Sequence, residues 1–597
     1  MSSKPWGSLS SPNILNKEPF LSGPFNPQSN LASVADRFLE AVVENGVDCV
    51  FLNPGTDTAP ILESLARRMT TGKDSPRLVL CLHEAVALAA AHGYYMVTGR
   101  PQLVVVHVDV GTQNLGAMLH NVWRGQIGVV IFAGRTPLVT YGGTLGRRDL
   151  PVHWQQDVPD QDGIVRPYVK LVADLRMPEL IDQQVHRAFQ VAAAVPPGAT
   201  YLTAGRELLM LSDSGAESPT ARARLAVPTV PGPTPESLAQ VVRWISEARR
   251  PVLTTTRVGR DPAAVPELVA LAERIGSPVV DRRERLNFPW DHPLYIREPE
   301  DLTRAIREAD LVIDVDSDVP WVPSIVEPSA SARIVRIETD PLRQDSPNWS
   351  FPADIAIQSD PVLALRMLNE ALERAGVSRV GWLEQSPTVP VGLPPGTASV
   401  MTQQQAIEAI AVALSPEDIV IEEVTTSADA MRRYLPRTMP GTHFQSGGSG
   451  LGWSIGAALG VKLATPDRRV VAILGDGAFM FNNPSVGLWV SIAQHAPTLV
   501  VVLDNGGYAA SRKPIVNLYP DGAYAGVAAA PGTAFNCSPD FVGIARASGY
   551  LGHNVSTKAE FEQVLATAVA DVDAGRGVLI VAQVSSPWLP EQSSTHT

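Results

Sequence analysis

Apolar stretches of strand length alternate with stretches of helical periodicity along most of this chain. In the first part, strands are predicted at residues 49–53, 78–82, 103–108 and 128–133. Apolar residues recur with helical spacing at residues 34–45, 58–69, 84–97 and 114–124. This alternation predicts parallel sheets with helices packed on both faces.

The same alternation continues in the middle and last parts of the chain. In the middle part, strands and helices are predicted at residues 251–255, 266–275, 279–281, 302–308, 311–316 and 334–338. Two proline-rich passages, 212–235 and 384–402, have no sustained periodicity and are typical of linkers. The predicted fold class is α/β, with three open, mainly parallel-sheet domains, and the chain divides into a tail at 1–30, domains at 31–211, 236–383 and 403–586, and a tail at 587–597.

The last part contains a candidate cation site. The triplet Gly475-Asp476-Gly477 follows one predicted strand, and Asn505 follows the next, after a predicted helix at 483–495. A βαβ crossover brings both strand ends to the same edge of the sheet, where ligands of open α/β sheets bind. A carboxylate, an amide and exposed glycine carbonyls form an all-oxygen site of the kind that Mg²⁺ prefers, completed by a phosphate group. Taken alone, the triplet is equally typical of an ordinary turn.

Polar residues also follow three predicted strands of the first domain. These are Glu84 at the start of an alanine-rich helix, the segment 107–114 (HVDVGTQN) and the segment 53–56 (NPGT). Each has a simpler interpretation, as a helix-terminal carboxylate, a helix cap or a core histidine at position 107. Their convergence at one sheet edge nevertheless favours a functional site.

Composition limits the classes of function. A net charge of −13 without a basic cluster argues against a general nucleic-acid binder. The three cysteines, widely spaced, are typical of core residues in a reducing compartment and not of zinc ligands. The first thirty residues have no apolar core of a signal peptide, and no window has the length of a membrane span. We therefore expect a cytoplasmic protein with no membrane or nucleic-acid partner.

These segments, together with the glycine-rich segment 447–453 (GGSGLGW), occur in an order that resembles a known family. The order is similar to that of the thiamine diphosphate (ThDP) enzymes of the acetolactate synthase, pyruvate oxidase and benzoylformate decarboxylase-like group. The resemblance spans about residues 31–586. It implies a pyrimidine-binding (PYR) domain, a central domain and a diphosphate-binding (PP) domain. It also implies a homodimer or homotetramer whose active sites lie between the first domain of one subunit and the third of another.

The resemblance assigns a cofactor site to the third domain. Asp476, Asn505 and the backbone carbonyl of Gly507 match the ligands that tie Mg²⁺ to the diphosphate. Leu451 matches the apolar residue over which the cofactor bends, although alone it would be assigned to the core. Two threonines match diphosphate-contacting positions and are equally typical of a helix N-cap pair. The full expected cofactor-binding set is Glu84, Thr425, Thr426, Gly450, Leu451, Gly475, Asp476, Gly477, Asn505, Gly507 and Tyr508.

The resemblance also assigns catalytic residues. Glu84 matches the carboxylate that shares a proton with the pyrimidine ring and so favours the tautomer that activates the thiazolium. His107 and Thr56 match substrate-facing positions, and Gln113 stands where a small residue is common. His292 either reaches the site or has a structural role.

Three features depart from the pattern or leave it open. The interval from Asp476 to Asn505 is slightly longer than in typical members, and residues 481–484 are the expected insertion. Asp504 replaces an amide residue beside the metal. The central domain has no clear flavin-binding pattern, so FAD, an adenine nucleotide or no nucleotide are all compatible with the sequence.

The leading hypothesis is a ThDP- and Mg²⁺-dependent lyase or carboligase that acts on a small-molecule 2-oxo acid, as a decarboxylase or an acetolactate synthase-like enzyme. The main alternative is a C–C lyase for a 2-hydroxyacyl-CoA, a diketone or a hydroxyketone, which acyl-CoA dependence would reveal. A flavin-linked 2-oxo acid oxidase would purify as a yellow protein. A non-catalytic scaffold would be expected to lose Glu84, Asp476 or Asn505, and the chain retains all three.

Overall fold

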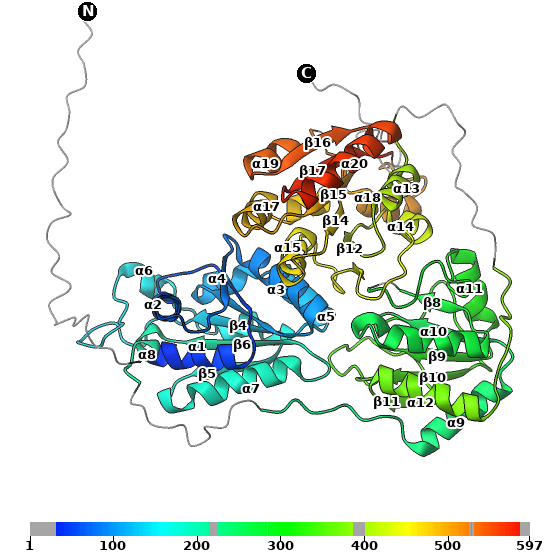
Figure 1. The fold of residues 1–597 in the computed structure, drawn as a ribbon, viewed down its shortest axis with the longest axis horizontal. Coiled ribbons are helices and arrows are strands. Elements are labelled where there is room, and N and C mark those ends of the chain that lie inside the picture. The colour runs from blue at the N-terminus through cyan, green and yellow to red at the C-terminus, as the bar shows by residue number, and fades with distance from the viewer. Residues whose placement is uncertain are drawn as a thin grey trace, which may run out of the picture.

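The structure, a computed structural model, describes residues 32–213, 225–282, 284–385, 400–524, 527, 530–535 and 537–585. Within these residues, three parallel sheets with flanking helices form three lobes (Figure 1). This confirms the predicted fold class. The predicted tails and parts of both predicted linkers lie outside the described residues. No helix within the described ranges is long and apolar enough to cross a lipid bilayer.

The first sheet has the strand order β2-β1-β3-β4-β6-β5, and every neighbouring pair is parallel. Its strands are β1 (Cys49–Leu52), β2 (Arg77–Leu80), β3 (Gln102–Val106), β4 (Val129–Gly134), β5 (Val169–Leu175) and β6 (Ala199–Ala204). Its helices are α1 (Val34–Glu44), α2 (Ala59–Thr70), α3 (Glu84–Thr98), α4 (Val108–Asn114), α5 (Ala117–Arg124), α6 (Pro151–Gln155), α7 (Ile181–Ala193) and α8 (Arg206–Leu209). The four inner strands are buried along their whole length, because helices cover both faces.

The central sheet has the order β11-β10-β9-β7-β8, again with parallel pairs throughout. Its strands are β7 (Pro251–Thr255), β8 (Val279–Asp281), β9 (Leu311–Val315), β10 (Arg333–Glu338) and β11 (Ile355–Gln358). Its helices are α9 (Pro235–Glu247), α10 (Ala264–Ile275), α11 (Pro299–Glu308) and α12 (Pro361–Arg374).

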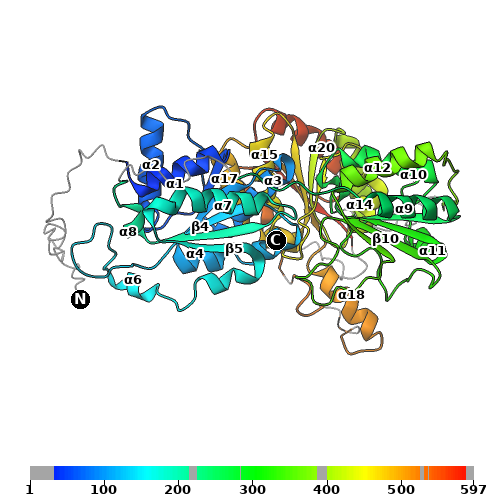
Figure 2. The same cartoon turned by 90° about the horizontal axis from the view of Figure 1, so that it is seen from below.

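The third sheet has the order β13-β12-β14-β15-β17-β16 and is also parallel. Its strands are β12 (Ile419–Glu423), β13 (His443–Phe444), β14 (Val470–Gly475), β15 (Leu499–Asp504), β16 (Leu551–Val555) and β17 (Val578–Gln583). Its helices are α13 (Gln403–Ala413), α14 (Ala428–Tyr434), α15 (Ser454–Ala464), α16 (Asp476–Phe481), α17 (Pro484–Ala493), α18 (Ala509–Leu518), α19 (Phe541–Ala547) and α20 (Lys558–Asp573). Figure 2 shows α18 projecting from the body of the molecule. The predicted crossover is present, since β14 and β15 pair in parallel and end at the same edge.

The predicted bounds of one helix in the first domain are wrong. The single helix expected at 114–124 is two helices, because α4 already begins at Val108 and α5 begins at Ala117. The break is at Gly116, whose φ of 51° is a left-handed conformation that glycine adopts freely. The polar segment after His107 is therefore mostly helical and not an open turn.

Helices α3 and α15 join the first and third domains in close contact. Alanine and glycine dominate both helices, which lets their backbones approach each other. A Cβ atom at Gly93 would overlap the carbonyl oxygen of Ala457, and one at Gly460 would overlap that of Ala90. Small residues at these positions thus fix how the two domains sit relative to each other.

Candidate active site

Glu84 lies at the carboxyl edge of the first sheet, as the first residue of α3. The helix is capped by His83, whose Nδ1 accepts a hydrogen bond from the Ala85 amide at 3.2 Å. The buried Glu84 carboxylate accepts from the side-chain amides of Asn53 at 2.9 Å and Asn114 at 3.1 Å. Each carboxylate oxygen has its own donor, so the group is held in one orientation.

His107, just after β3, lies between an acidic and an amide side chain. Its Nδ1 is hydrogen-bonded to Oδ1 of the buried Asp57, and its Nε2 lies 2.9 Å from Nε2 of Gln156. Because an ionised carboxylate only accepts hydrogen bonds, Asp57 places the proton of a neutral imidazole on Nδ1. Nε2 then accepts from Gln156.

Thr56 belongs to the same set of contacts. Its side chain is exposed, and its Oγ1 accepts from Nη2 of Arg148 at 3.2 Å. The same Nη2 donates to Oε1 of Gln156 at 2.8 Å. Thr56, His107 and Gln156 are thus linked through the guanidinium of a fully buried arginine.

Two further predicted catalytic residues have other surroundings. Gln113 is exposed on α4 and donates to Oδ2 of Asp109 at 3.2 Å. His292 lies in the central domain, with its Nε2 at 3.2 Å from Oε1 of Glu273 and its ring edge-on to Phe288. Within the described part of one chain, the structure does not bring His292 to the Glu84 set.

Asp476 is buried at the carboxyl end of β14 as the first residue of α16. Its Oδ1 accepts from the Gly477 amide at 2.7 Å, and its Oδ2 accepts from the Gly507 amide at 2.8 Å. Asp504, the last residue of β15, lies beside it and accepts from the Gly506 amide at 3.0 Å. Burial and the neighbouring Asp504 raise the pKa of Asp476 well above its ordinary value. Two buried carboxylates this close to each other favour a bound cation.

Asn505 and Gly507 add two neutral oxygens to this edge. The Asn505 Nδ2 donates to Oγ1 of Thr426 at 3.2 Å, whereas its buried Oδ1 has no hydrogen-bond partner among the described residues. The Gly507 carbonyl accepts from the Ala509 amide at 3.1 Å and keeps a second lone pair. The described residues contain no group of three or more His, Cys, Asp or Glu that could hold a metal, so the cation would depend on these amide and carbonyl oxygens. The oxygens fit a hard cation such as Mg²⁺.

Glu423, at the end of β12, organises the glycine-rich turn that precedes α15. Its carboxylate accepts from the amides of Gly452, Trp453 and Ser454 at 2.6, 3.1 and 2.9 Å. It also accepts from Nδ2 of Asn482 at 2.9 Å. Asn482 lies in the expected insertion at 481–484, which forms the corner between α16 and α17.

The other expected cofactor-binding residues lie around this turn and the Asp476 edge. Gly450 exchanges two hydrogen bonds with the side chain of Asn121, at 2.8 and 2.9 Å. Leu451 is half-buried, and Thr425 is exposed directly after β12 and Val424. Gly475 ends β14, and a Cβ at Gly477 would lie 2.5 Å from the ring of Tyr508, so only glycine fits beneath this ring.

The Glu84 set and the Asp476 set lie in different domains. In the described ranges, the hydrogen bonds of Glu84 stay within the first domain, and those of Asp476 and Asn505 stay within the third. Each set is at the carboxyl edge of its own sheet. The molecule therefore carries two half-sites.

Both sets of residues lie in regions of the chain that match models of known protein families. Residues 32–164 match the N-terminal TPP binding domain of thiamine pyrophosphate enzymes, residues 238–368 match their central domain, and residues 423–582 match their C-terminal TPP binding domain. The chain belongs to the thiamine diphosphate-dependent enzymes.

Relatives of this ThDP enzyme include decarboxylases and acetolactate synthases. Benzoylformate decarboxylase of Pseudomonas aeruginosa is 28% identical over 560 residues, which cover 91% of this chain and 97% of the relative. The acetolactate synthase large subunit of Parasynechococcus marenigrum is 25% identical over 567 residues, which cover 90% and 85%. In fold, the chain is similar to the ThDP-dependent 4-hydroxybenzoylformate decarboxylase of Rhodococcus jostii, with a TM-score of 0.77 at 22% identity over 94% of this chain and 100% of that one.

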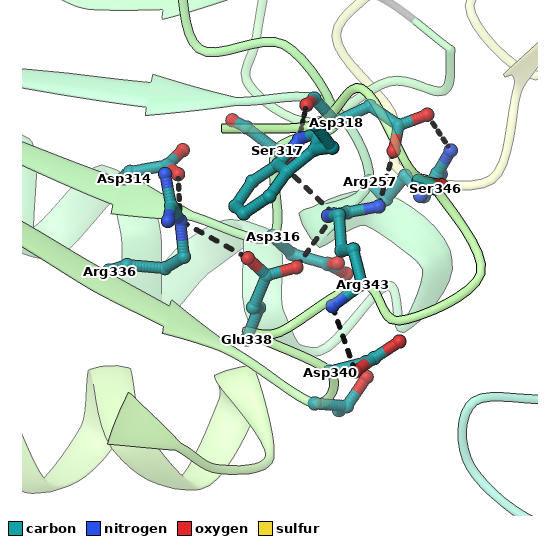
Figure 3. A network of polar contacts seen from close by, with 12 residues as sticks. Arg257, Asp314, Asp316, Ser317, Asp318, Arg336, Glu338, Asp340, Arg343 and Ser346 are labelled. Atoms are coloured by element: carbon teal, nitrogen blue, oxygen red, sulfur yellow. Dashed lines mark hydrogen bonds and ion pairs between the residues drawn. The ribbon is translucent and has the colours of Figure 1, made fainter. Parts of the chain in front are cut away.

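The central domain of this ThDP enzyme has a network of buried charges at the carboxyl edge of its sheet (Figure 3). Arg257 pairs with Glu284 at 2.7 Å, Arg343 pairs with Glu338 at 2.6 Å, and Arg336 pairs with Asp314 at 3.1 Å. A cavity of about 320 Å³ lies between this network and the first domain. FAD and an adenine nucleotide were both compatible with the sequence, and the contacts in the described residues assign neither.

Four residues that contact the predicted site residues are absent from the sequence-based set. Asp57 follows Thr56 directly, so its place at a strand end was a usable signal. Glu423 is the last residue of β12, directly after an apolar run, so its place at a strand end was also a usable signal. Arg148 lies in an irregular segment and Gln156 directly follows α6, and no pattern in the sequence links them to Thr56.

Proposed function

We propose that this enzyme uses ThDP and Mg²⁺ to cleave the bond between the carboxylate and the carbonyl carbon of a 2-oxo acid. The observation that carries the proposal is the pair of half-sites, one built on Glu84 and the other on Asp476 and Asn505. The similarity to benzoylformate decarboxylase and to acetolactate synthase supports this class of substrate.

The cofactor would be anchored in the third domain. Asp476, Asn505 and the Gly507 carbonyl would hold Mg²⁺ against the diphosphate, and the unpartnered Oδ1 of Asn505 is the strongest support for this role. The cation would also offset the repulsion between Asp476 and Asp504. When bound, ThDP supplies a nucleophilic carbon and an electron sink for the cleaved bond.

Residues of the first domain would move protons. Glu84, held by two amides, would exchange a proton with the pyrimidine ring of the cofactor. His107 would exchange a proton with the substrate through Nε2, because Asp57 fixes the proton on Nδ1. Thr56 is exposed beside them and would contact the substrate.

A second copy of the chain would complete each site. In the described ranges the printed hydrogen bonds of Glu84 stay in the first domain and those of Asp476 and Asn505 stay in the third, so we expect the first domain of one subunit to face the third domain of its partner. The complete enzyme would then be a homodimer or a larger homo-oligomer, with the site closed from water at the interface.

The test is product analysis with purified protein, ThDP and Mg²⁺. A panel of aliphatic and aromatic 2-oxo acids, including benzoylformate, is incubated with and without an aldehyde acceptor, and products are identified by NMR. An aldehyde indicates a decarboxylase and a hydroxyketone indicates a ligase, both as proposed. Turnover of 2-hydroxyacyl-CoA, with every 2-oxo acid left intact, would contradict the proposal.

A further inference from the structure

Arg148 is a buried cation without a carboxylate partner. The residue is fully buried, yet in the described residues its guanidinium forms no ion pair. It donates to the Arg135 carbonyl at 3.1 Å, to Oε1 of Gln156 at 2.8 Å and to Oγ1 of Thr56 at 3.2 Å. Its Nε–H has no acceptor. A buried arginine is normally paired with a carboxylate, so an anion bound at Arg148 would stabilise this guanidinium.

A second guanidinium supports the same region without neutralising it. Arg206 donates to the backbone carbonyls of Gly146, Thr56 and Arg147 at 2.8, 3.0 and 2.6 Å. In the described residues it also forms no ion pair. Burial lowers the pKa of both Arg148 and Arg206, and the nearby carboxylates of Asp57 and Glu207 offset this effect only in part. Arg206 thus holds the segment that carries Arg148 while leaving the positive charge in place.

Two side chains that reach solvent stand next to the Arg148 guanidinium. Thr56 is exposed, and Gln156 is half-buried. Gln156 bridges two groups, since its Oε1 accepts from Arg148 while its Nε2 lies 2.9 Å from Nε2 of His107. An anion that displaces Gln156 from Arg148 would therefore also free the His107 nitrogen that faces the substrate.

The chemistry of decarboxylation indicates which anionic group belongs here. A guanidinium bonded to the carboxylate that leaves as CO₂ stabilises the substrate more than the transition state, because charge moves away from that group. A second carboxylate keeps its charge throughout the reaction. A guanidinium that donates two hydrogen bonds to this second carboxylate raises the affinity for the substrate and does not oppose the bond cleavage.

We propose that Arg148 binds the distal carboxylate of the substrate, so that the enzyme selects 2-oxo dicarboxylic acids over 2-oxo monocarboxylic acids. The inference rests on the proposed function, since it specifies the substrate of the same site. Binding of this carboxylate at Arg148 replaces Gln156 and exposes Nε2 of His107. Arg148 is thus a specificity-determining residue whose charge is matched only when a dicarboxylate is bound.

The first experiment compares kcat/KM for matched substrates. Oxaloacetate, 2-oxoglutarate and 2-oxoadipate are each paired with the 2-oxo monocarboxylate of equal carbon number. We expect the enzyme to prefer at least one dicarboxylate, and Arg148→Met to lower kcat/KM for it by about 10- to 100-fold while the monocarboxylate changes by less than about three-fold. Absence of a preference, or an equal loss for both members of a pair, would overturn the proposal.

Two further variants keep the experiment decisive. Arg147→Met is the matched control, because Arg147 is more exposed and pairs with Asp149 at 2.8 Å, and it should keep the preference. If Arg148→Met fails to fold, Arg148→Lys preserves the charge and removes the fork. It should lose most of the dicarboxylate preference, and full retention in a folded Arg148→Lys variant would count against the assignment.

A binding measurement separates this inference from the proposed function. Succinate, glutarate and adipate cannot be decarboxylated by this route, so calorimetric titration of the ThDP–Mg²⁺ enzyme with them reads binding alone. We expect at least one to bind to the wild type and to Arg147→Met, and to lose at least about ten-fold in affinity in Arg148→Met. If no 2-oxo acid reacts but this pattern appears, the proposed reaction fails and the anion site stands. Equal binding to all three proteins, or none to any, would overturn the site.

Discussion

The oxygen atoms around Asp476 form the part of the site whose chemistry is most sharply defined. Asp476 and Asp504 are buried side by side, and Asn505 Oδ1 has no partner. Such an arrangement is unfavourable without a cation and favourable with one. The substitution of Asp476 should therefore affect cofactor binding before it affects anything else.

We expect Asp476→Ala to weaken binding of ThDP in the presence of Mg²⁺ by more than about ten-fold, because a charged ligand of the cation is lost. Calorimetric titration of cofactor-free protein with ThDP at fixed Mg²⁺ measures the change. Asp504→Asn is the matched control, since it removes the neighbouring carboxylate without removing an assigned ligand, and it should retain binding. Unaltered affinity in Asp476→Ala would contradict the assignment.

At this scale, the sequence indicates candidate site residues where a polar residue follows a strand. Glu84, Asp476 and Asn505 were predicted because polar residues at strand ends converge on one edge. Arg148 was not predictable, because it meets Thr56 from a position 92 residues away in an irregular segment. Only the folded chain brings such a pair together.

Among the contacts between helices, the contact of α3 with α15 leaves the least room for larger side chains. Both helices lack a strong polar face, and glycines allow their backbones to touch. His92 lies in this contact, fully enclosed, with its ring 5.2 Å from that of Trp453 and with neither ring nitrogen hydrogen-bonded.

We expect Gly460→Ala to destabilise the protein, because the new methyl group would overlap the Ala90 carbonyl. The cost of forcing an atom into a filled contact is about 1–3 kcal/mol, which exceeds the gain in helix propensity of about 1 kcal/mol. Chemical denaturation measures the difference. Gly143→Ala is the control, since nothing lies within 4 Å of a Cβ there, and equal stability of both variants would refute the tight contact.

Burial holds the pKa of His92 well below its ordinary value of about 6.5. Below pH 6.5 the unfolded chain binds a proton at this residue that the folded chain does not, so stability falls as the pH decreases. We expect the thermal midpoint of the wild type to fall between pH 7.5 and pH 5.5, and that of His92→Leu to fall less. Below pH 6.5, the free energy of unfolding of the wild type should decrease by up to about 1.4 kcal/mol more per pH unit than that of the variant. Identical pH dependence in both proteins would show that His92 is not enclosed.

Sequence patterns predicted most elements but not all. β7 and β8 have the bounds that the sequence predicts, because every residue of both strands is buried, although β8 lies at the edge of the sheet. β5 was not predicted, since an edge strand with the sequence VKLVADL mixes polar and apolar residues. β6 was missed because its sequence ATYLTA carries small and hydroxyl side chains.

For the whole molecule, the separation of the half-sites predicts sites shared between subunits. Glu84 and Asp476 belong to different sheets, and within the described part of one chain their own hydrogen bonds stay in their separate domains. The fold and the existence of both half-sites were predictable from the order of motifs. How they meet was not derivable from the residues alone, because under the proposed function it depends on a second chain.

We expect Glu84→Gln and Asp476→Ala subunits to complement each other when co-expressed. If Glu84 of one subunit serves the cofactor held by Asp476 of another, a mixed dimer has one intact site, and random pairing restores about a quarter of wild-type activity. Selection of mixed dimers by two different tags should raise the activity to about half of the wild type, because every selected dimer then has one intact site of two. Dimers that assemble but stay inactive would place both residues in a site within one chain.

The central claim is that this chain releases CO₂ from a 2-oxo acid by proton exchange through Glu84. The most direct measurement is release of ¹³CO₂ from carboxyl-labelled 2-oxo acids by the wild type and by Glu84→Gln, each with its ThDP content determined. The account predicts labelled CO₂ from the wild type, and a loss of about 100-fold or more in Glu84→Gln at equal ThDP occupancy. No labelled CO₂ from cofactor-loaded wild type, or equal release by both proteins, would contradict it.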